Sequence, residues 1–284
     1  MTLPSTSHSA ATDETRFAFG RNWADFLSVL DNERIAEAER SLTDFLDLSD
    51  LQGRTFLDIG SGSGLFSLAA KRLGAARVHS FDYDPDSVAC TRELKHRFFR
   101  DDAGWTIDQA SVLDSTYLQS LGTFDVVYAW GVLHHTGQMW GAFSHVMDLV
   151  KPGGRLYVAI YNDQGAASSR WRLIKRLYNR GPFVVRQALL LAVGAYFIGR
   201  GVLGRITRPG HAMPLTSCGH RGKRGRGMSR WHDLVDWVGG YPFEVAKPED
   251  VFDFCRARGF ALRRLKTVGG GLANNEFVFI RTAE

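Results

Sequence analysis

The chain has 284 residues, of which 44% are hydrophobic and 23% charged, a globular composition with room for one large core or one core plus an insertion. Its 35 Lys and Arg residues exceed its 30 Asp and Glu residues by only five, so the net charge alone does not indicate a nucleic-acid-binding protein. The three cysteines are widely spaced and lack metal-ligand spacing. This pattern favours reduced thiols in a cytoplasmic protein and argues against a disulfide framework or a metal site.

The N-terminal region divides into a polar part and an apolar, periodic part. Residues 1–16 contain no apolar run of the kind found in secretory signals, so we expect a disordered tail. Residues 17–51 repeat apolar side chains at helical spacing, which predicts helices that pack on the core.

A glycine-rich turn follows a short apolar strand, expected at 55–59, and leads into an amphipathic helix. Gly60, Gly62 and Gly64 let the backbone approach a ligand closely at a helix N-terminus. A dinucleotide-binding fingerprint would need Gly or Ala where the chain has Leu65, and a phosphate-binding P-loop would need a Gly-Lys-Ser/Thr sequence. The turn therefore favours a nucleoside that carries no pyrophosphate.

Strands and helices alternate after this turn, which predicts a parallel sheet with right-handed crossovers. A helix that begins at Pro248 and two strands around a run of three glycines end the chain as a hairpin. The expected strands are 77–81, 105–110, 124–129, 155–160, 261–268 and 276–280, and the expected helices between them are 65–73, 86–99 and 140–150.

Residues 163–245 break the alternation and predict a helical insertion. Residues 170–178 form a basic amphipathic pattern, and residues 187–199 are uncharged. The uncharged stretch is shorter than the roughly 20 residues that span a bilayer. Two interpretations stay open for it: buried packing, or a peripheral membrane contact through residues 171–205. We expect the Gly/Arg-rich segment 219–230 to be a solvated connection.

Four motifs occur in an order and spacing that resembles the class I S-adenosylmethionine-dependent methyltransferases. They most resemble the small-molecule branch, which includes the ubiquinone-biosynthesis O-methyltransferases. The motifs are LDIGSGSG at 57–64, FDYDPDS at 81–87, FDVVYAWGVLHH at 124–135 and LVKPGGRLYVAIYN at 149–162.

The resemblance implies an α/β fold, a Rossmann-like, seven-stranded, mostly parallel sheet with an antiparallel last strand. It implies that residues 52–162 form the S-adenosylmethionine-binding core, that residues 246–284 complete it, and that the insertion at 163–245 holds the substrate region. It also offers a second role for the N-terminal helices at 17–51, as a lid over the cofactor.

The cofactor S-adenosylmethionine needs a carboxylate for its ribose hydroxyls. Asp82 ends the second strand, 18 residues after Gly64, while Asp84 competes for this role or caps the next helix. In the resembled family an Asp often meets the adenine where this chain has Ser111, and Asp114 is the alternative. Asp58 either orders the loop or contacts the ligand. The full cofactor-binding set that we expect is Asp58, Gly60, Ser61, Gly62, Gly64, Asp82, Tyr83, Ser111, Val112, Trp130 and Trp23.

Catalysis needs alignment of the methyl group and, for a hydroxyl or thiol acceptor, removal of a proton. His134 and His135 follow the fourth strand at the sheet edge where ligands bind, so one of them is the expected base, with a slight preference for His134. The competing interpretation is that each packs or caps a helix. We expect the acceptor to contact Tyr161, Asn162, His232, Trp237 and Tyr241.

The chain is therefore expected to be a methyltransferase acting on a small, apolar or aromatic acceptor, with oxygen preferred over nitrogen or sulfur. The strand-four motif lacks the Asp/Asn-Pro-Pro-aromatic sequence of nucleobase amine methylases. Two alternatives stay open: an RNA methyltransferase, indicated by the Gly/Arg-rich segment and an isoelectric point near 9.2, and a non-catalytic S-adenosylmethionine-binding protein. The sequence predicts no oligomeric state.

Overall fold

A computed structural model describes residues 23, 27–28, 30–207, 230–269 and 273–282. The expected tail at 1–16 and nearly all of the Gly/Arg-rich segment lie outside these residues.

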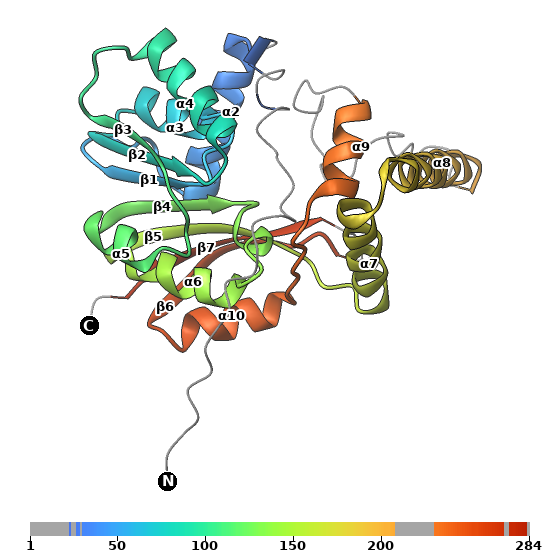
Figure 1. The fold of residues 1–284 in the computed structure, drawn as a ribbon. Coiled ribbons are helices and arrows are strands. Elements are labelled where there is room, and N and C mark those ends of the chain that lie inside the picture. Colours follow the sequence, from blue (N-terminus) through green and yellow to red (C-terminus); the bar gives the residue numbers. More distant parts are fainter. Residues whose placement is uncertain (1–22, 24–26, 29, 208–229, 270–272, 283–284) are drawn as a thin grey trace.

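The core is a seven-stranded sheet with the order β3-β2-β1-β4-β5-β7-β6 (Figure 1). Strands β1 to β5 pair in parallel, and β7 runs antiparallel to both of its neighbours. This confirms the predicted Rossmann-like sheet with its closing hairpin. The strands are β1 (Thr55–Ile59), β2 (Arg77–Asp82), β3 (Trp105–Gln109), β4 (Phe124–Trp130), β5 (Val150–Tyr161), β6 (Phe260–Lys266) and β7 (Asn274–Arg281).

Helices cover both faces of the sheet and enclose two apolar cores. Side chains alternate between the faces along each strand, so Phe56 of β1 enters one core and Leu57 the other. The helices α2 (Asn32–Leu46), α3 (Leu65–Arg72) and α4 (Pro85–Phe98) pack on one face, and α5 (Ser115–Ser120), α6 (Met139–Asp148) and α10 (Pro248–Arg256) pack on the other.

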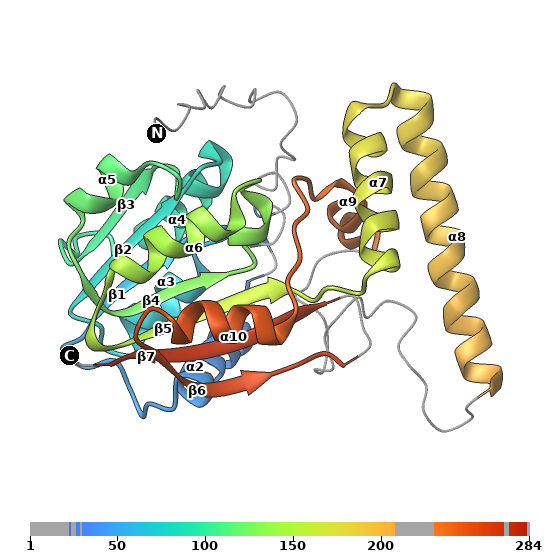
Figure 2. The ribbon, with the colours of Figure 1, turned by 90° about the horizontal axis from the view of Figure 1, so that it is seen from below.

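The insertion forms a third, separate apolar cluster from α7 (Ala166–Arg180), α8 (Phe183–Thr207) and α9 (Arg230–Gly239). Figure 2 shows α7 and α8 as a pair of neighbouring helices beside the sheet, with α8 outermost. Helix α8 extends well beyond the uncharged stretch of the sequence at both ends. The buried members of the cluster are Trp171, Leu190, Val193, Trp237, Val238 and Phe243.

Candidate functional site

The glycine turn between β1 and α3 is fixed to the end of β2 by its own backbone. The N–H groups of Gly60 and Ser61 both donate to the Phe81 carbonyl, at 2.8 and 3.1 Å. The N–H of Gly62 donates to Asp82 Oδ2 at 2.9 Å. The turn and the carboxylate that ends β2 therefore form one rigid unit.

All three glycines of the turn combine a positive φ with a close neighbour, and at Gly60 an added Cβ would lie 2.4 Å from the nearest side-chain atom. Gly64 has a φ of +79°, and a Cβ there would lie 2.8 Å from the Cα of Thr91 in α4. Gly62 has a φ of +55°, and a Cβ there would lie 3.1 Å from the indole of Trp23. The Trp23 indole therefore lies against the turn, and the lid role of this region stays a prediction.

Asp82 occupies the position expected for a ribose-binding carboxylate. Its Oδ1 accepts from the Asp84 N–H at 2.9 Å, and burial raises its pKa to about 6. A carboxylate has about four acceptor sites, so capacity remains for a ligand hydroxyl beside the bonds from the backbone N–H groups of Gly62, Tyr83 and Asp84. Asp84 accepts from the Asp86 N–H at 3.0 Å as the cap of α4. Of the two competing carboxylates, Asp82 is thus the one that faces the turn.

Asp58 lies beneath the turn and is hydrogen-bonded within the protein. It is 1% exposed, and it accepts a hydrogen bond from Ser67, whose hydroxyl lies 2.7 Å from that of Ser80. Burial raises the pKa of Asp58 to about 7. These contacts support the loop-ordering role for Asp58, which was one of the two interpretations from sequence.

The turn after β3 lies beside Asp82, because the Ala110 N–H donates to the Asp82 carbonyl at 3.0 Å. Asp114 caps α5 through a backbone N–H at 3.0 Å, whereas the Ser111 hydroxyl accepts from a backbone N–H in its own turn, at 3.2 Å. Val112 places its side chain in the core. Tyr83 is 43% exposed just beyond Asp82.

Trp130 ends β4 and contacts the last strand rather than the turn. It is hydrogen-bonded to Glu276 of β7, which also accepts from Tyr157 at 2.5 Å and from Lys266 at 2.8 Å. This carboxylate fixes the indole at the carboxyl end of β4.

The two histidines lie in a short 3-10 turn, η2 (Leu133–His135), and their environments differ. His134 is fully buried, and its Nδ1 accepts from the Tyr161 N–H at 3.4 Å. Burial, then the neighbouring imidazole of His135 and the charge of Lys175, hold the pKa of His134 well below its ordinary value. No atom of the described residues is a hydrogen-bond partner for His134 Nε2.

His135 is half-buried and has a fixed orientation. Its Nδ1 lies 2.7 Å from the Pro242 carbonyl, which can only accept, so Nδ1 carries the proton and Nε2 carries the lone pair. Burial lowers the pKa of His135 to about 4, and the charge of Lys175 adds to the shift. The imidazole is therefore neutral at neutral pH.

Tyr161, at the end of β5, joins the histidines to the insertion. Its ring centroid lies 4.0 Å from that of His134, 5.5 Å from that of His135 and 5.9 Å from that of Trp237. The indole Nε1 of Trp237 is buried and, like His134 Nε2, has no hydrogen-bond partner among the described residues. Two buried polar nitrogens thus flank one aromatic ring.

The other three residues expected at the acceptor differ in their surroundings. Asn162 is hydrogen-bonded to the Gly269 carbonyl and to Asn275, both at 3.0 Å, which is a packing role. Tyr241 is half-buried next to Pro242. His232 lies in α9, and its side chain is outside the described part of the chain.

Lys175 of α7 belongs to this cluster, and the sequence reasoning missed it. Its side chain is fully buried, its ammonium donates to the Trp237 carbonyl, and it lies 4.6 and 5.0 Å from the ring centroids of Trp237 and Phe243. Its position in the helical repeat indicates burial, because Lys175 falls between Trp171 and Tyr178 on the apolar face of the helix.

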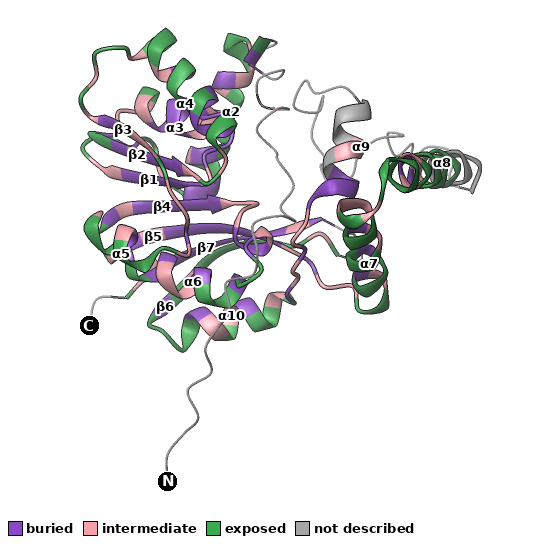
Figure 3. Ribbon diagram, in the orientation of Figure 1, coloured by how far each residue is buried: buried purple, intermediate pink, exposed green. Residues whose placement is uncertain are grey.

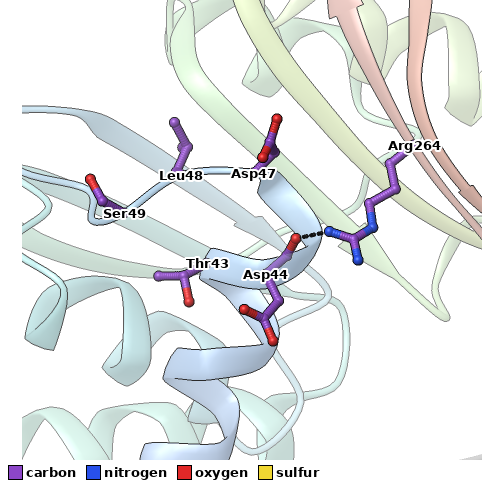
Figure 4. A pocket seen from close by; sticks show the side chains of 6 residues that line it. All are labelled: Thr43, Asp44, Asp47, Leu48, Ser49 and Arg264. Carbon is purple, nitrogen blue, oxygen red and sulfur yellow. Dashed lines mark hydrogen bonds between the residues drawn. The ribbon is translucent and has the colours of Figure 1, made fainter.

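A polar depression of about 400 Å³ lies elsewhere, between the end of α2 and β6 (Figure 4). Asp44 and Arg264, whose guanidinium donates to the Asp44 carbonyl, line it. The end of α2 leads into the start of β1, so this depression is at the opposite edge of the sheet from the glycine turn.

Comparison with known proteins identifies the core. Residues 57–156 match the family model described as "Methyltransferase domain". The ribosomal protein L11 methyltransferase of Methylococcus capsulatus is 52% identical over 50 residues, which is 18% of this chain and 17% of that protein. The corresponding protein of Yersinia pseudotuberculosis is 43% identical over 53 residues, 19% of this chain and 18% of that protein. The chain thus spans less than a fifth of the length of these curated relatives.

Solved structures share the fold over most of the chain. The N-methyltransferase NodS from Bradyrhizobium japonicum, in complex with S-adenosyl-L-homocysteine, aligns with a TM-score of 0.52 at 15% identity, covering 95% of this chain and 100% of that chain. An O-methyltransferase family protein from Burkholderia thailandensis aligns with a TM-score of 0.52 at 15% identity, covering 88% and 57%. The match at residues 57–156 agrees with the predicted enzyme class and with the predicted cofactor, S-adenosylmethionine.

Proposed function

We propose that this protein transfers a methyl group from S-adenosylmethionine to an oxygen of a small, apolar or aromatic acceptor. The enzyme class rests on the methyltransferase domain at 57–156. The observation that carries the acceptor class is the cluster around Tyr161, where aromatic rings enclose the buried nitrogens of His134 and Trp237. Buried polar groups need partners, so an acceptor that fits here is mostly apolar and offers one or two polar atoms.

The residues around the glycine turn fit the cofactor. The carboxylate of Asp82 would bind the ribose hydroxyls, Gly62 would allow close approach, and Trp23 would cover the ligand. S-adenosylmethionine, when bound, supplies an electrophilic methyl group on a sulfonium whose leaving group is neutral, so no acid is required of the protein.

His135 is the residue that we assign as the base. The Pro242 carbonyl accepts from its Nδ1–H, which sets the tautomer that carries the lone pair on Nε2, and Nε2 is the atom that would take the proton of an acceptor hydroxyl. His134, which the sequence slightly favoured, is fully buried and packs against Tyr161. We therefore give His134 a wall-forming and hydrogen-bonding role.

Lys175 supports an oxygen acceptor over a nitrogen acceptor. An amine nucleophile gains positive charge during methylation, whereas a hydroxyl becomes an oxyanion as its proton leaves. A buried ammonium whose charge acts on both histidines would stabilise the oxyanion and oppose the cation. An oxygen acceptor also agrees with the resemblance of the motifs to small-molecule O-methyltransferases.

A transfer assay tests the proposal. The full chain is incubated with methyl-labelled S-adenosylmethionine and cellular extract, and the extract is separated into metabolite, protein and RNA fractions. We expect label in an apolar metabolite, with mass fragmentation placing the methyl group on oxygen. Label in RNA or protein would overturn the acceptor class, and cofactor binding without label in any fraction would overturn the activity itself.

A further inference from the structure

We propose that α7 and α8 dock this protein on the surface of an anionic lipid bilayer, with the outer face of α8 lying in the interfacial layer. The proposal concerns the insertion alone and does not depend on the methyl-transfer activity.

The outer face of α8 is apolar along its described length. Val184, Ala188, Leu191, Ala195 and Ile198 follow the alternating spacing of four and three residues that defines one helix stripe, and all five are exposed. The described part of α8 is coloured mostly as exposed in Figure 3. Val184, Leu191 and Ile198 are 75%, 67% and 60% exposed. The opposite stripe contains Leu190 and Val193, which are buried in the insertion's own cluster.

Exposed apolar side chains are concentrated in these two helices. Among the described residues, eight of the twelve large hydrophobic side chains that are exposed belong to α7 or α8. Single exposed apolar residues are normal on a protein surface, but a contiguous exposed stripe marks an interaction site.

The charge of the insertion selects the partner. Residues 164–232 contain 14 Lys and Arg residues and no Asp or Glu, whereas the rest of the chain contains 21 Lys and Arg against 30 Asp and Glu. Basic residues flanking an apolar helix face are the signature of a helix that binds an anionic membrane surface. The same charge disfavours a second copy as the partner, because a two-fold contact through α8 would bring two basic segments together.

The arrangement favours lying on a membrane over crossing one. Helix α8 has 25 residues, and at about 1.5 Å per residue it is about 37 Å long. None of the helices in the described ranges is apolar enough to cross a bilayer. Arginines at 186 and 200 bound the uncharged stretch of the sequence, which is shorter than the roughly 20 residues that span a bilayer.

Vesicle flotation of the full chain tests the docking. Vesicles of phosphatidylcholine with one third phosphatidylglycerol are compared with vesicles of phosphatidylcholine alone. We expect flotation with the anionic vesicles only, and a fall of about tenfold or more in the partition coefficient for L191E/I198E. The matched control is L265E, which adds a charge at a 43% exposed leucine on β6 and is expected to float like the parent.

A second pair of variants tests the basic residues. R176Q/R180Q removes two exposed arginines of α7 and should weaken binding about fivefold per residue. R256Q/R258Q removes two exposed arginines at and just after the end of α10 and should leave binding unchanged. Circular dichroism and thermal unfolding of each variant establish that its fold is intact.

Four outcomes would overturn the proposal: no flotation with either vesicle, equal loss with L265E, binding to RNA in place of vesicles, or a dimer in light scattering that L191E/I198E dissociates. Because flotation requires no turnover, a failure here is separate from a failure of the transfer assay.

Discussion

We assign the cofactor to the glycine turn and the acceptor to the seam between core and insertion, and the two regions are built by different means. The seam is the cluster of His134, His135, Tyr161, Lys175 and Trp237. At the turn, backbone does the positioning: Gly62 donates to Asp82, and Gly64 lets α3 approach Thr91. At the seam, side chains from four separate segments meet around Tyr161. A turn positioned by its backbone requires particular residues at neighbouring positions, so it can be recognised from the local sequence. A cluster of side chains from distant segments depends on tertiary packing and cannot. The comparison predicts that damage at the turn lowers stability and cofactor affinity, and damage at the seam lowers turnover.

The largest effect is expected at the seam, in His135→Gln. Loss of a general base lowers kcat by about 10²- to 10⁴-fold, while affinity for S-adenosylhomocysteine, measured by calorimetry, should not change. The imidazole is a base only when neutral, and its pKa is lowered to about 4, so parent activity should lose this contribution only as the pH falls towards 4. An acid limb near the ordinary histidine pKa, or full activity in the variant, would remove His135 from this role.

At the turn, Gly64→Ala should lower the free energy of unfolding by about 3 kcal/mol, because it combines a positive φ with overpacking against Thr91. Gly122→Ala is the matched control. Gly122 has a φ of +70°, but a Cβ there meets nothing within 4 Å, so about 1 kcal/mol is expected. Denaturant unfolding measures both. Equal losses would mean that the approach of α3 to α4 is not close enough to require glycine.

Asp82→Asn should weaken cofactor binding by about 100-fold, because hydrogen bonds to a charged acceptor are worth more than those to a neutral one. Asp84→Asn, at the cap of α4, should leave affinity unchanged. The pKa of Asp82 is raised to about 6, so the carboxylate is ionised above this pH and affinity should fall as the pH drops below it. Calorimetry with S-adenosylhomocysteine against pH decides; a flat profile together with unchanged affinity would reject the assignment.

The smallest effect is expected for Glu244→Ala, which removes a carboxylate that accepts from the Met139 N–H at the start of α6. Loss of such a cap costs about 1 kcal/mol. Thermal unfolding would detect it, and kcat should change little because the backbone N–H of residue 244, which donates to the His134 carbonyl, is retained in the variant. A larger loss of cofactor affinity than of kcat would contradict the division between the two regions.

The sheet was predictable because its signals are local. The strand at Thr55–Ile59, the glycines after it and Pro85 at the start of α4 each lie within a few residues of the feature they specify. Helix α5 was missed because six residues are too few for a periodic pattern. The burial of His134 and the Pro242 carbonyl that orients His135 depend on a segment more than 100 residues away, so the preference between the histidines could not be settled from sequence.

Helix α7 has one further consequence, because its two sides serve different partners. Lys175 and Trp171 face inward, towards the aromatic cluster, while Leu173 and Leu177 are 57% and 47% exposed on the other side. Because both pairs of side chains belong to one rigid helix, a movement of Leu173 and Leu177 also moves Lys175 and Trp171. If the outer side binds lipid, adsorption would alter the position of the Lys175 ammonium. The rate of methyl transfer would then differ between membrane-bound and free protein.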